Sequence, residues 1–242
     1  MPRATAPATT ELTQQTVATL LAAVDENLIF GVVRVHDAFL DGCPKPARRA
    51  LEDFRGGVIV VFALPITDIG LWLWYAAGDR RFVFANHILE RAANALIADC
   101  QRQGVPYCDV ARVHPGVVSL VALGESAGLG RRGRNNLLLH PVHGSWLQLH
   151  AVAMGRETEA SPPAIENPCI SCFRCIVACP AKAISGRGFS AERCTRFVAS
   201  FWMPRSKARA LSPNTYVECN ACISACPVAQ PPTGLAAHEV SR

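Results

Sequence analysis

The sequence contains no long block of like charge, and charged residues make up only 18% of its 242 positions. Its formal net charge of +5 indicates a mildly basic surface and does not point to a particular partner. The opening residues, MPRATAPATTELTQQ, lack the apolar stretch of a secretory signal, so we expect a cytoplasmic protein. Half of the residues are hydrophobic, which suits a folded protein of one large or two modest domains.

The sequence also lacks an uninterrupted membrane span. The run VIVVFALPITDIGLWLWYAA at 58–77 is long enough to cross a bilayer, but it contains Pro65, Asp68 and Gly70. A central aspartate costs a few kcal/mol in lipid. The β-branched start followed by proline instead indicates a buried strand that leads into a loop, and we expect no membrane partner.

Helical and strand-like segments alternate over the first part of the chain, which predicts an α/β domain up to residue 155. The expected helices cover 11–26, 82–104 and 117–128, with Thr10 as N-cap of the first and Gly104 as C-cap of the second. The expected strands cover 28–35, 57–64, 106–113, 136–140 and 145–154. A polar, proline-rich linker at 155–168 then separates a domain at 1–155 from a second at 156–242.

Cysteine is concentrated in the second domain, which holds eight of the 11 cysteines. Without export, such density indicates metal binding rather than a disulfide framework. CISCFRCIVACP at 169–180 is a complete C-x2-C-x2-C-x3-C-P run, the bacterial ferredoxin motif for [4Fe–4S] clusters. Zinc is the alternative, because paired C-x2-C units also build zinc sites. The cysteine–proline ending and a second run downstream favour iron–sulfur clusters.

The second run, YVECNACISACP at 216–227, is one cysteine short, because Tyr216 stands at the first ligand position. In a two-cluster fold each run gives three ligands to its own cluster and lends its last cysteine to the other. The first cluster is therefore assigned to Cys169, Cys172, Cys175 and Cys226. The second is assigned to Cys179, Cys194, Cys219 and Cys222. Cys194 fills the gap because soft thiolates suit these clusters better than a phenol does; the alternative is that it is a buried bystander.

These cysteine motifs and two upstream segments resemble the epoxyqueuosine reductase and reductive dehalogenase family. ESAGLGRRGRNNLLLHPVHGSWLQL at 125–149 is similar to that family's AGLGWIGKNTLL…GSWFFL stretch, and GVIVVFALPI is similar to its SVIVVALPY strand. The resemblance implies an α+β protein. An N-terminal α/β, nitroreductase-like domain would bind cobalamin, and a ferredoxin-like domain with two [4Fe–4S] clusters would follow it.

The resemblance also implies site residues. The candidate cobalamin wall consists of Gly128, Gly130, Gly133, Arg134, Gly144, Ser145 and Trp146. The family's proton-donating aspartate falls on His114, which is a competent general acid near neutral pH; the alternative is a solvated loop residue. GRRGR replaces the family's GWIGK, so Arg131, Arg132 and Arg134 stand together, either as an anion site or as a solvated loop.

The resemblance implies a cobalamin-dependent reductase that removes an oxygen or halogen substituent from a small or nucleoside-like substrate. Its electron donor would be a ferredoxin or flavodoxin. The chain ends soon after Cys226 and lacks the helical-repeat tail that helps many relatives hold tRNA, so we do not expect tRNA as a partner of this short variant. The alternative function is electron transfer to, or reactivation of, a partner corrinoid enzyme.

The sequence does not predict a dinucleotide-binding site. GLGRRG at 128–133 matches G-x-G-x-x-G, but a helix rather than a strand is expected before it, and no acidic residue lies near position 150.

Overall fold

The computed structural model describes residues 13–77, 80–160, 165–201, 210–212, 215–228 and 231–234. Its centre is a four-stranded sheet of β1 (Ile29–Arg34), β2 (Val58–Pro65), β8 (Leu147–Met154) and β5 (Tyr107–Asp109), in that order. Every neighbouring pair is antiparallel. β2 is buried at all eight positions, which explains the unbroken apolar start of the run at 58–77.

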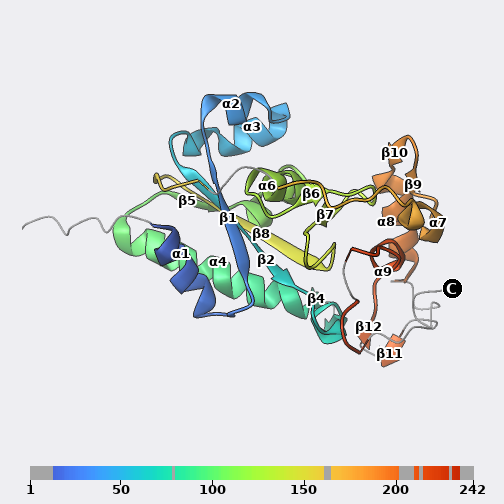
Figure 1. Cartoon of the computed structure of the whole chain (residues 1–242). Coiled ribbons are helices and arrows are strands. Elements are labelled where there is room, and N and C mark those ends of the chain that lie inside the picture. The colour runs from blue at the N-terminus through green and yellow to red at the C-terminus, as the bar shows by residue number, and fades with distance from the viewer. Residues whose placement is uncertain are drawn as a thin grey trace, which may run out of the picture.

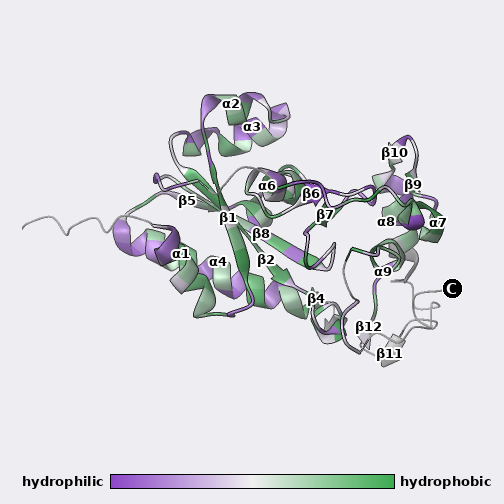
Figure 2. Ribbon diagram, viewed as in Figure 1, coloured by the Kyte–Doolittle hydropathy of each residue, from purple (hydrophilic) through white to green (hydrophobic). Residues whose placement is uncertain are grey.

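Helices cover both faces of this sheet (Figure 1). α1 (Gln14–Ala22) and α4 (Phe84–Gln103) lie on one face, and α2 (Asp37–Asp41), α3 (Lys45–Leu51) and α6 (Leu120–Ser126) lie on the other. Successive residues of β2 alternate between the two hydrophobic cores. Val60 and Phe62 join the core beneath α1 and α4, whereas Val61 joins the core beneath α6. Figure 2 shows these apolar strands between the more polar outer faces of the helices.

A second sheet joins the two halves of the sequence. Its order is β11 (Ala210–Ser212), β12 (Thr215–Tyr216), β3 (Trp74–Ala77) and β4 (Arg80–Val83). β12 pairs antiparallel with β3, so Tyr216 lies opposite Trp74. Thr233 also returns to the first half, where its N–H donates to the carbonyl of Thr67 (2.9 Å). The regions predicted as separate domains therefore share backbone pairing.

The remaining elements are short. They are η1 (Glu52–Phe54), η2 (Ile69–Leu71), α5 (Val110–Val113), β6 (Arg131–Arg132), β7 (Leu138–Leu139), α7 (Arg174–Ala178), β9 (Ile184–Ser185), β10 (Gly188–Phe189), α8 (Ala191–Phe201) and α9 (Ala221–Ser224). None of the helices within the described ranges is both long and apolar enough to cross a membrane. The run at 58–77 contains β2, η2 and β3 instead.

Several element boundaries differ from the sequence expectations. The first helix begins after Thr13, whose side chain accepts the Thr16 N–H, while the expected cap Thr10 lies outside the described residues. α4 begins only at Phe84, because the preceding residues pair as β4 with β3. The strand expected at 106–113 ends at Asp109, because its carboxylate accepts the Arg112 N–H and starts α5.

The expected end of α4 is confirmed. Gly104 has a left-handed conformation (φ 66°) and its N–H donates to carbonyls of the last helical turn.

Candidate metal centre

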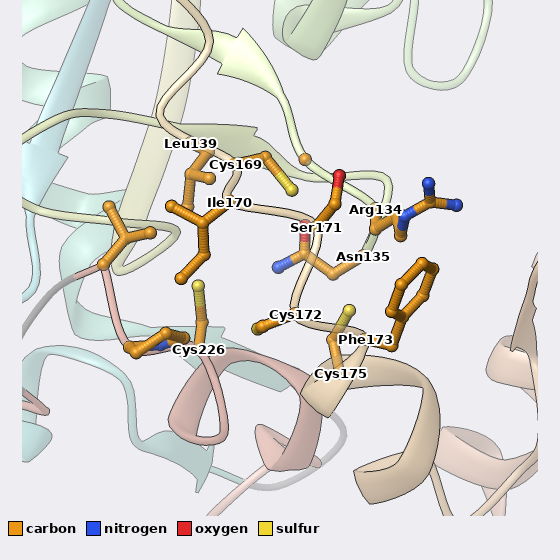
Figure 3. Close-up of a pocket in the computed structure, with 13 residues that line it drawn as sticks. Arg134, Asn135, Leu139, Cys169, Ile170, Ser171, Cys172, Phe173, Cys175 and Cys226 are labelled. Carbon is orange, nitrogen blue, oxygen red and sulfur yellow. The ribbon is translucent and has the colours of Figure 1, made fainter.

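Four cysteines from both runs line one pocket. Three come from the first run, and Cys226 comes from the second; Gly133, Arg134, Asn135 and Leu139 of the N-terminal half complete the wall. Figure 3 shows Cys169, Cys172, Cys175 and Cys226 around this pocket. The pocket is narrow, about 20 Å³, so the four thiols rather than its volume point to a cluster. This grouping matches the set expected for the first cluster.

The first run bends tightly around this pocket. Ser171 (φ 54°) and Phe173 (φ 60°) both adopt the left-handed conformation, which non-glycine residues rarely do. The Cys169 N–H donates to the Asn167 side chain (3.0 Å), which fixes the entry of the loop. α7 then starts at Arg174 and places Cys175 in its first turn.

The other four cysteines interact electrostatically as a second group. The pKa of the Cys222 thiol is raised to about 12, first by burial and then by the charges of Cys219, Cys179, Cys194 and, least, Cys175. Burial also raises the pKa of Cys194, followed by the charges of Cys219 and Cys179. Such mutual repulsion between thiolates is relieved when a cationic core binds them.

No three His, Cys, Asp or Glu side chains among the described residues converge as ligands of a single metal ion do. Four sulfurs around one tetrahedral zinc ion would lie about 3.8 Å apart, as follows from the Zn–S bond length. A cubane cluster binds each thiolate at a different corner and therefore suits a wider arrangement of thiols.

Tyr216, at the vacant position of the second run, belongs to β12 rather than to a ligand loop. Its backbone pairs with Trp74. Beside it, the Trp74 indole donates a hydrogen bond to Glu218 (3.0 Å), and burial raises the pKa of that carboxyl. This contact fixes the chain immediately before Cys219.

The residues suggested to line a cobalamin site lie in different parts of the structure. Gly133 and Arg134 line the cysteine pocket, whereas Trp146 lines a separate cavity of about 270 Å³ with His143, Thr67 and other residues. Ser145 is buried and accepts a hydrogen bond from Asn135 (3.0 Å).

Three glycines of this set are explained by backbone conformation or by close packing. Gly128 (φ 74°) and Gly144 (φ 57°) occupy turns with left-handed backbone. A Cβ at Gly130 would meet the carbonyl oxygen of Leu139 at 2.6 Å, so glycine permits the close approach of this loop to β7.

The three arginines of GRRGR do not form one anion site. Arg132 is bound to Glu125 through its backbone N–H (2.8 Å) and its guanidinium (3.5 Å). Arg134 instead stacks on the Phe173 ring, with 4.5 Å from its guanidinium carbon to the ring centroid. Arg131 pairs with Leu139 in the β6–β7 hairpin.

His114 lies at the end of α5 and is half-buried. Its carbonyl accepts the N–H groups of Val117 (3.1 Å) and Val118 (3.4 Å). Both valines line a cavity of about 470 Å³, together with Arg132, Cys43 and residues of α2, α3 and α6. His114 thus carries the loop that forms one side of this cavity.

Two histidine arrangements were not anticipated. His140 and His143 stack with ring centroids 4.8 Å apart, because the β-turn between β7 and β8 brings their rings together. Burial lowers the pKa of both. His150 lies elsewhere, buried beside Asp109 at 2.9 Å. Residue spacing could not reveal the second pair, since its partners lie on strands β8 and β5.

The comparisons with known proteins agree with these motifs. No family model matches the chain. Epoxyqueuosine reductase of Lactococcus garvieae (strain Lg2) is 30% identical over 151 residues, which is 59% of this chain and 41% of the relative. The enzyme of the same name from Staphylococcus aureus (strain NCTC 8325 / PS 47) is 30% identical over 161 residues, covering 62% and 42%. The chain therefore spans about two fifths of the length of these curated relatives.

Solved structures show the same fold. An epoxyqueuosine reductase in complex with a tRNA-Tyr stem loop superposes with a TM-score of 0.61 at 18% identity, over 89% of this chain and 64% of that chain. A reductive dehalogenase, described with a mechanism for B12-dependent dehalogenation, superposes with a TM-score of 0.61 at 18% identity, over 88% and 31%. The resemblance inferred from the motifs is confirmed: the chain is similar in sequence to epoxyqueuosine reductases over part of their length, and it shares the fold of these enzymes and of a reductive dehalogenase.

Proposed function

We propose that the chain is an iron–sulfur oxidoreductase with two [4Fe–4S] clusters on the two cysteine groups. The observation that carries this proposal is the pocket in which Cys226 joins the three leading cysteines of the first run. Thiolates are the ligands that such clusters require, and a bound cluster supplies one-electron transfer at low potential.

We further propose that the reaction is reductive removal of an oxygen or halogen substituent from a small or nucleoside-like molecule. The cavity of about 470 Å³ beside α6 has the volume of a small-ligand site. His114 anchors the loop that borders this cavity. His114, at the family's proton-donor position, is the candidate general acid, because reductive loss of a substituent consumes a proton.

Cobalamin remains a prediction of the family resemblance. Gly133 and Arg134 line the cysteine pocket and Trp146 lines a different cavity, so these three residues do not fit a single corrin site and no reaction step is assigned to that cofactor. The support comes from relatives, of which one is described with B12-dependent dehalogenation.

An electron-transfer or corrinoid-reactivating protein that serves a partner enzyme is the second candidate. The placement of Gly133 and Arg134 in one cavity and of Trp146 in another favours this candidate, because such a protein needs clusters but no corrin pocket of its own. A cytoplasmic location fits both candidates and remains a prediction.

The expectation against tRNA is at odds with the related structure that holds a tRNA-Tyr stem loop. That chain is longer, and this one covers 64% of it. Binding of tRNA is therefore tested directly, as one arm of the experiment below.

The first experiment is anaerobic purification with iron, sulfide, zinc and cobalt analysis, followed by Co(II) EPR after addition of cobalamin. We expect about eight irons per chain, as two cubanes require. Zinc in place of iron would refute both candidates. A base-off Co(II) signal would support the reductase, whereas eight irons without cobalamin binding would leave the electron-transfer protein.

The second experiment measures reduction of an epoxyqueuosine-bearing tRNA stem loop and of the free nucleoside, with wild type and His114→Ala. A general acid predicts that His114→Ala loses most turnover while it retains iron and any cobalamin signal. Full turnover in the variant would remove His114 from the mechanism. Mobility shift of the stem loop on the same protein decides whether tRNA binds.

A further inference from the structure

Three exposed apolar side chains belong to the first cysteine run. Ile170 is 69% exposed, Phe173 47% and Val177 88%. Ile170 and Phe173 line the same pocket as the four cysteines. The Val177 N–H donates to the carbonyl of Phe173, the residue that precedes α7 (3.2 Å), so the two residues are one turn apart. We call these three residues the outer patch.

Two cationic side chains adjoin the outer patch, and we call them its rim. The Arg134 guanidinium stacks on Phe173, and Arg174 follows that residue directly; both arginines are exposed. Residues 165–201 as a whole contain five cationic and two acidic side chains, all exposed: Arg174, Lys182, Arg187, Arg193, Arg196, Glu166 and Glu192. Of the two acids, Glu192 is paired with Arg196 (3.0 Å). Bound clusters would add negative charge within the domain, but the two side chains of the rim are positive.

The first cysteine group contains Cys172, the exposed member of the eight cysteines. Cys222 of the second group instead packs against the main hydrophobic core of the N-terminal half. A carrier that docks beside Cys172 would therefore approach the first group from the solvent side.

We propose that the outer patch is the docking site of a small, acidic, one-electron carrier protein. This rests on the proposed clusters. A small apolar contact within a charged rim is typical of transient electron-transfer complexes, which bury little area and associate through complementary charge. A second copy of this chain fits poorly, because two positive rims would face each other. In the complex the carrier loses one electron and the cluster on the first cysteine group gains it; no bond is made or broken.

The test compares two reductants on the anaerobically purified, cluster-loaded chain. Reduced bacterial flavodoxin is the protein probe, and dithionite is the small probe that needs no docking site. Stopped-flow bleaching of the cluster absorbance gives both rates. The readout is the ratio of the flavodoxin rate to the dithionite rate, because partial loss of clusters in a variant does not change that ratio.

We expect Val177→Asp and Arg174→Glu each to lower this ratio at least tenfold, because each places negative charge on the patch. Raising the salt concentration should lower it for the wild type. Val113→Asp is the matched control, since Val113 is 59% exposed on α5 and lies outside the patch; its ratio should equal that of the wild type.

An unchanged ratio in both patch variants would overturn the docking site. Arg134→Gln gives an independent check, because it removes a rim charge that comes from outside the cysteine run, and it should lower the ratio as well. The cluster assignment fails separately, through iron analysis of the wild type. A chain with two clusters and unaffected patch variants would thus reject the docking site alone.

Discussion

Cys194 lies one turn into α8, where its N–H donates to the Ser190 carbonyl (3.2 Å). Its electrostatic partners, Cys219 and Cys179, come from two different runs. This coupling supports the proposal that Cys194, which lies outside both motifs, is the fourth thiol of the second group, and its role can be tested alone.

We predict that Cys194→Ser lowers the iron content from about eight to about four per chain, because a cubane with three thiolates is lost or degraded. Iron and sulfide analysis with EPR of the reduced protein measures this. Cys108→Ser is the control, since Cys108 lies on β5 and outside both groups. Equal iron in the Cys194 and Cys108 variants would show that Cys194 is a bystander.

The buried pair of Asp109 and His150 is a second interaction between individual side chains that can be tested. Burial works to raise the pKa of Asp109, but the hydrogen bond and charge of His150, and the contacts with Arg112, outweigh it and leave that pKa lowered. Because the folded-state pKa lies below the ordinary value of 3.8, the carboxylate stabilises the fold above pH 3.8. That stability is lost as the pH falls through the lowered pKa.

We predict that Asp109→Asn lowers the free energy of unfolding at pH 7 by about 1–3 kcal/mol, the usual effect of weakening a buried hydrogen bond to a charged group. The difference from wild type should shrink below pH 3.8. Denaturant titrations followed by circular dichroism at several pH values measure both effects. Asp41→Asn, in the exposed pair with Arg48 (2.8 Å), should cost less than about 1 kcal/mol.

Among the elements, β1 and the end of α6 approach each other closely at Gly31. A Cβ added there would overlap the carbonyl oxygen of Ala127, at the end of α6. This contact sets the position of the AGLG segment that follows, and through it the loop beside the cysteine pocket.

We predict that Gly31→Ala destabilises the protein by at least about 1–3 kcal/mol, the usual cost of overpacking. Gly186→Ala is the matched control, because its Cβ would meet no heavy atom within 4 Å. Thermal unfolding of the two variants provides the comparison. Similar melting temperatures would mean that α6 shifts away from β1 without cost.

Helices and strands were predictable from the sequence where the local pattern of apolar and polar residues determines them. β2 and α4 follow from an unbroken apolar run and from amphipathic spacing that ends at Gly104. The strand at 106–113 was wrong beyond Asp109, because one side-chain cap turns the chain into α5. β4 was missed, because its residues are a strand only through pairing with β3.

At the scale of the whole molecule, the cysteine-rich half is tied to the N-terminal half by backbone and side-chain contacts. β12 extends the sheet of β3, and Ile223 of α9 belongs to the main core. Thr233 forms an isolated parallel β-bridge with Asp68 of the N-terminal half. The cysteine-rich half is thus held directly against the N-terminal half.

We predict that removal of iron with a chelator loosens only the cysteine-rich half. Metal binding contributes folding free energy to the segments that hold the ligands. Hydrogen exchange should therefore rise in α7 and α9 and remain slow in β2 and β8, which are buried in the central sheet. Equal loss of protection in both regions would contradict this.

Residue spacing along the chain was enough to predict the ferredoxin run and the resemblance to epoxyqueuosine reductases, and it leads to the proposed assignment of the thiols to two groups. Ligand spacing within a run is short-range, so it survives in the linear sequence. Folding alone decided the antiparallel order of the sheet, the pairing of β12 with β3, and the separation of Trp146 from Arg134. These depend on contacts between residues far apart in sequence, and residue type alone does not encode which of them meet.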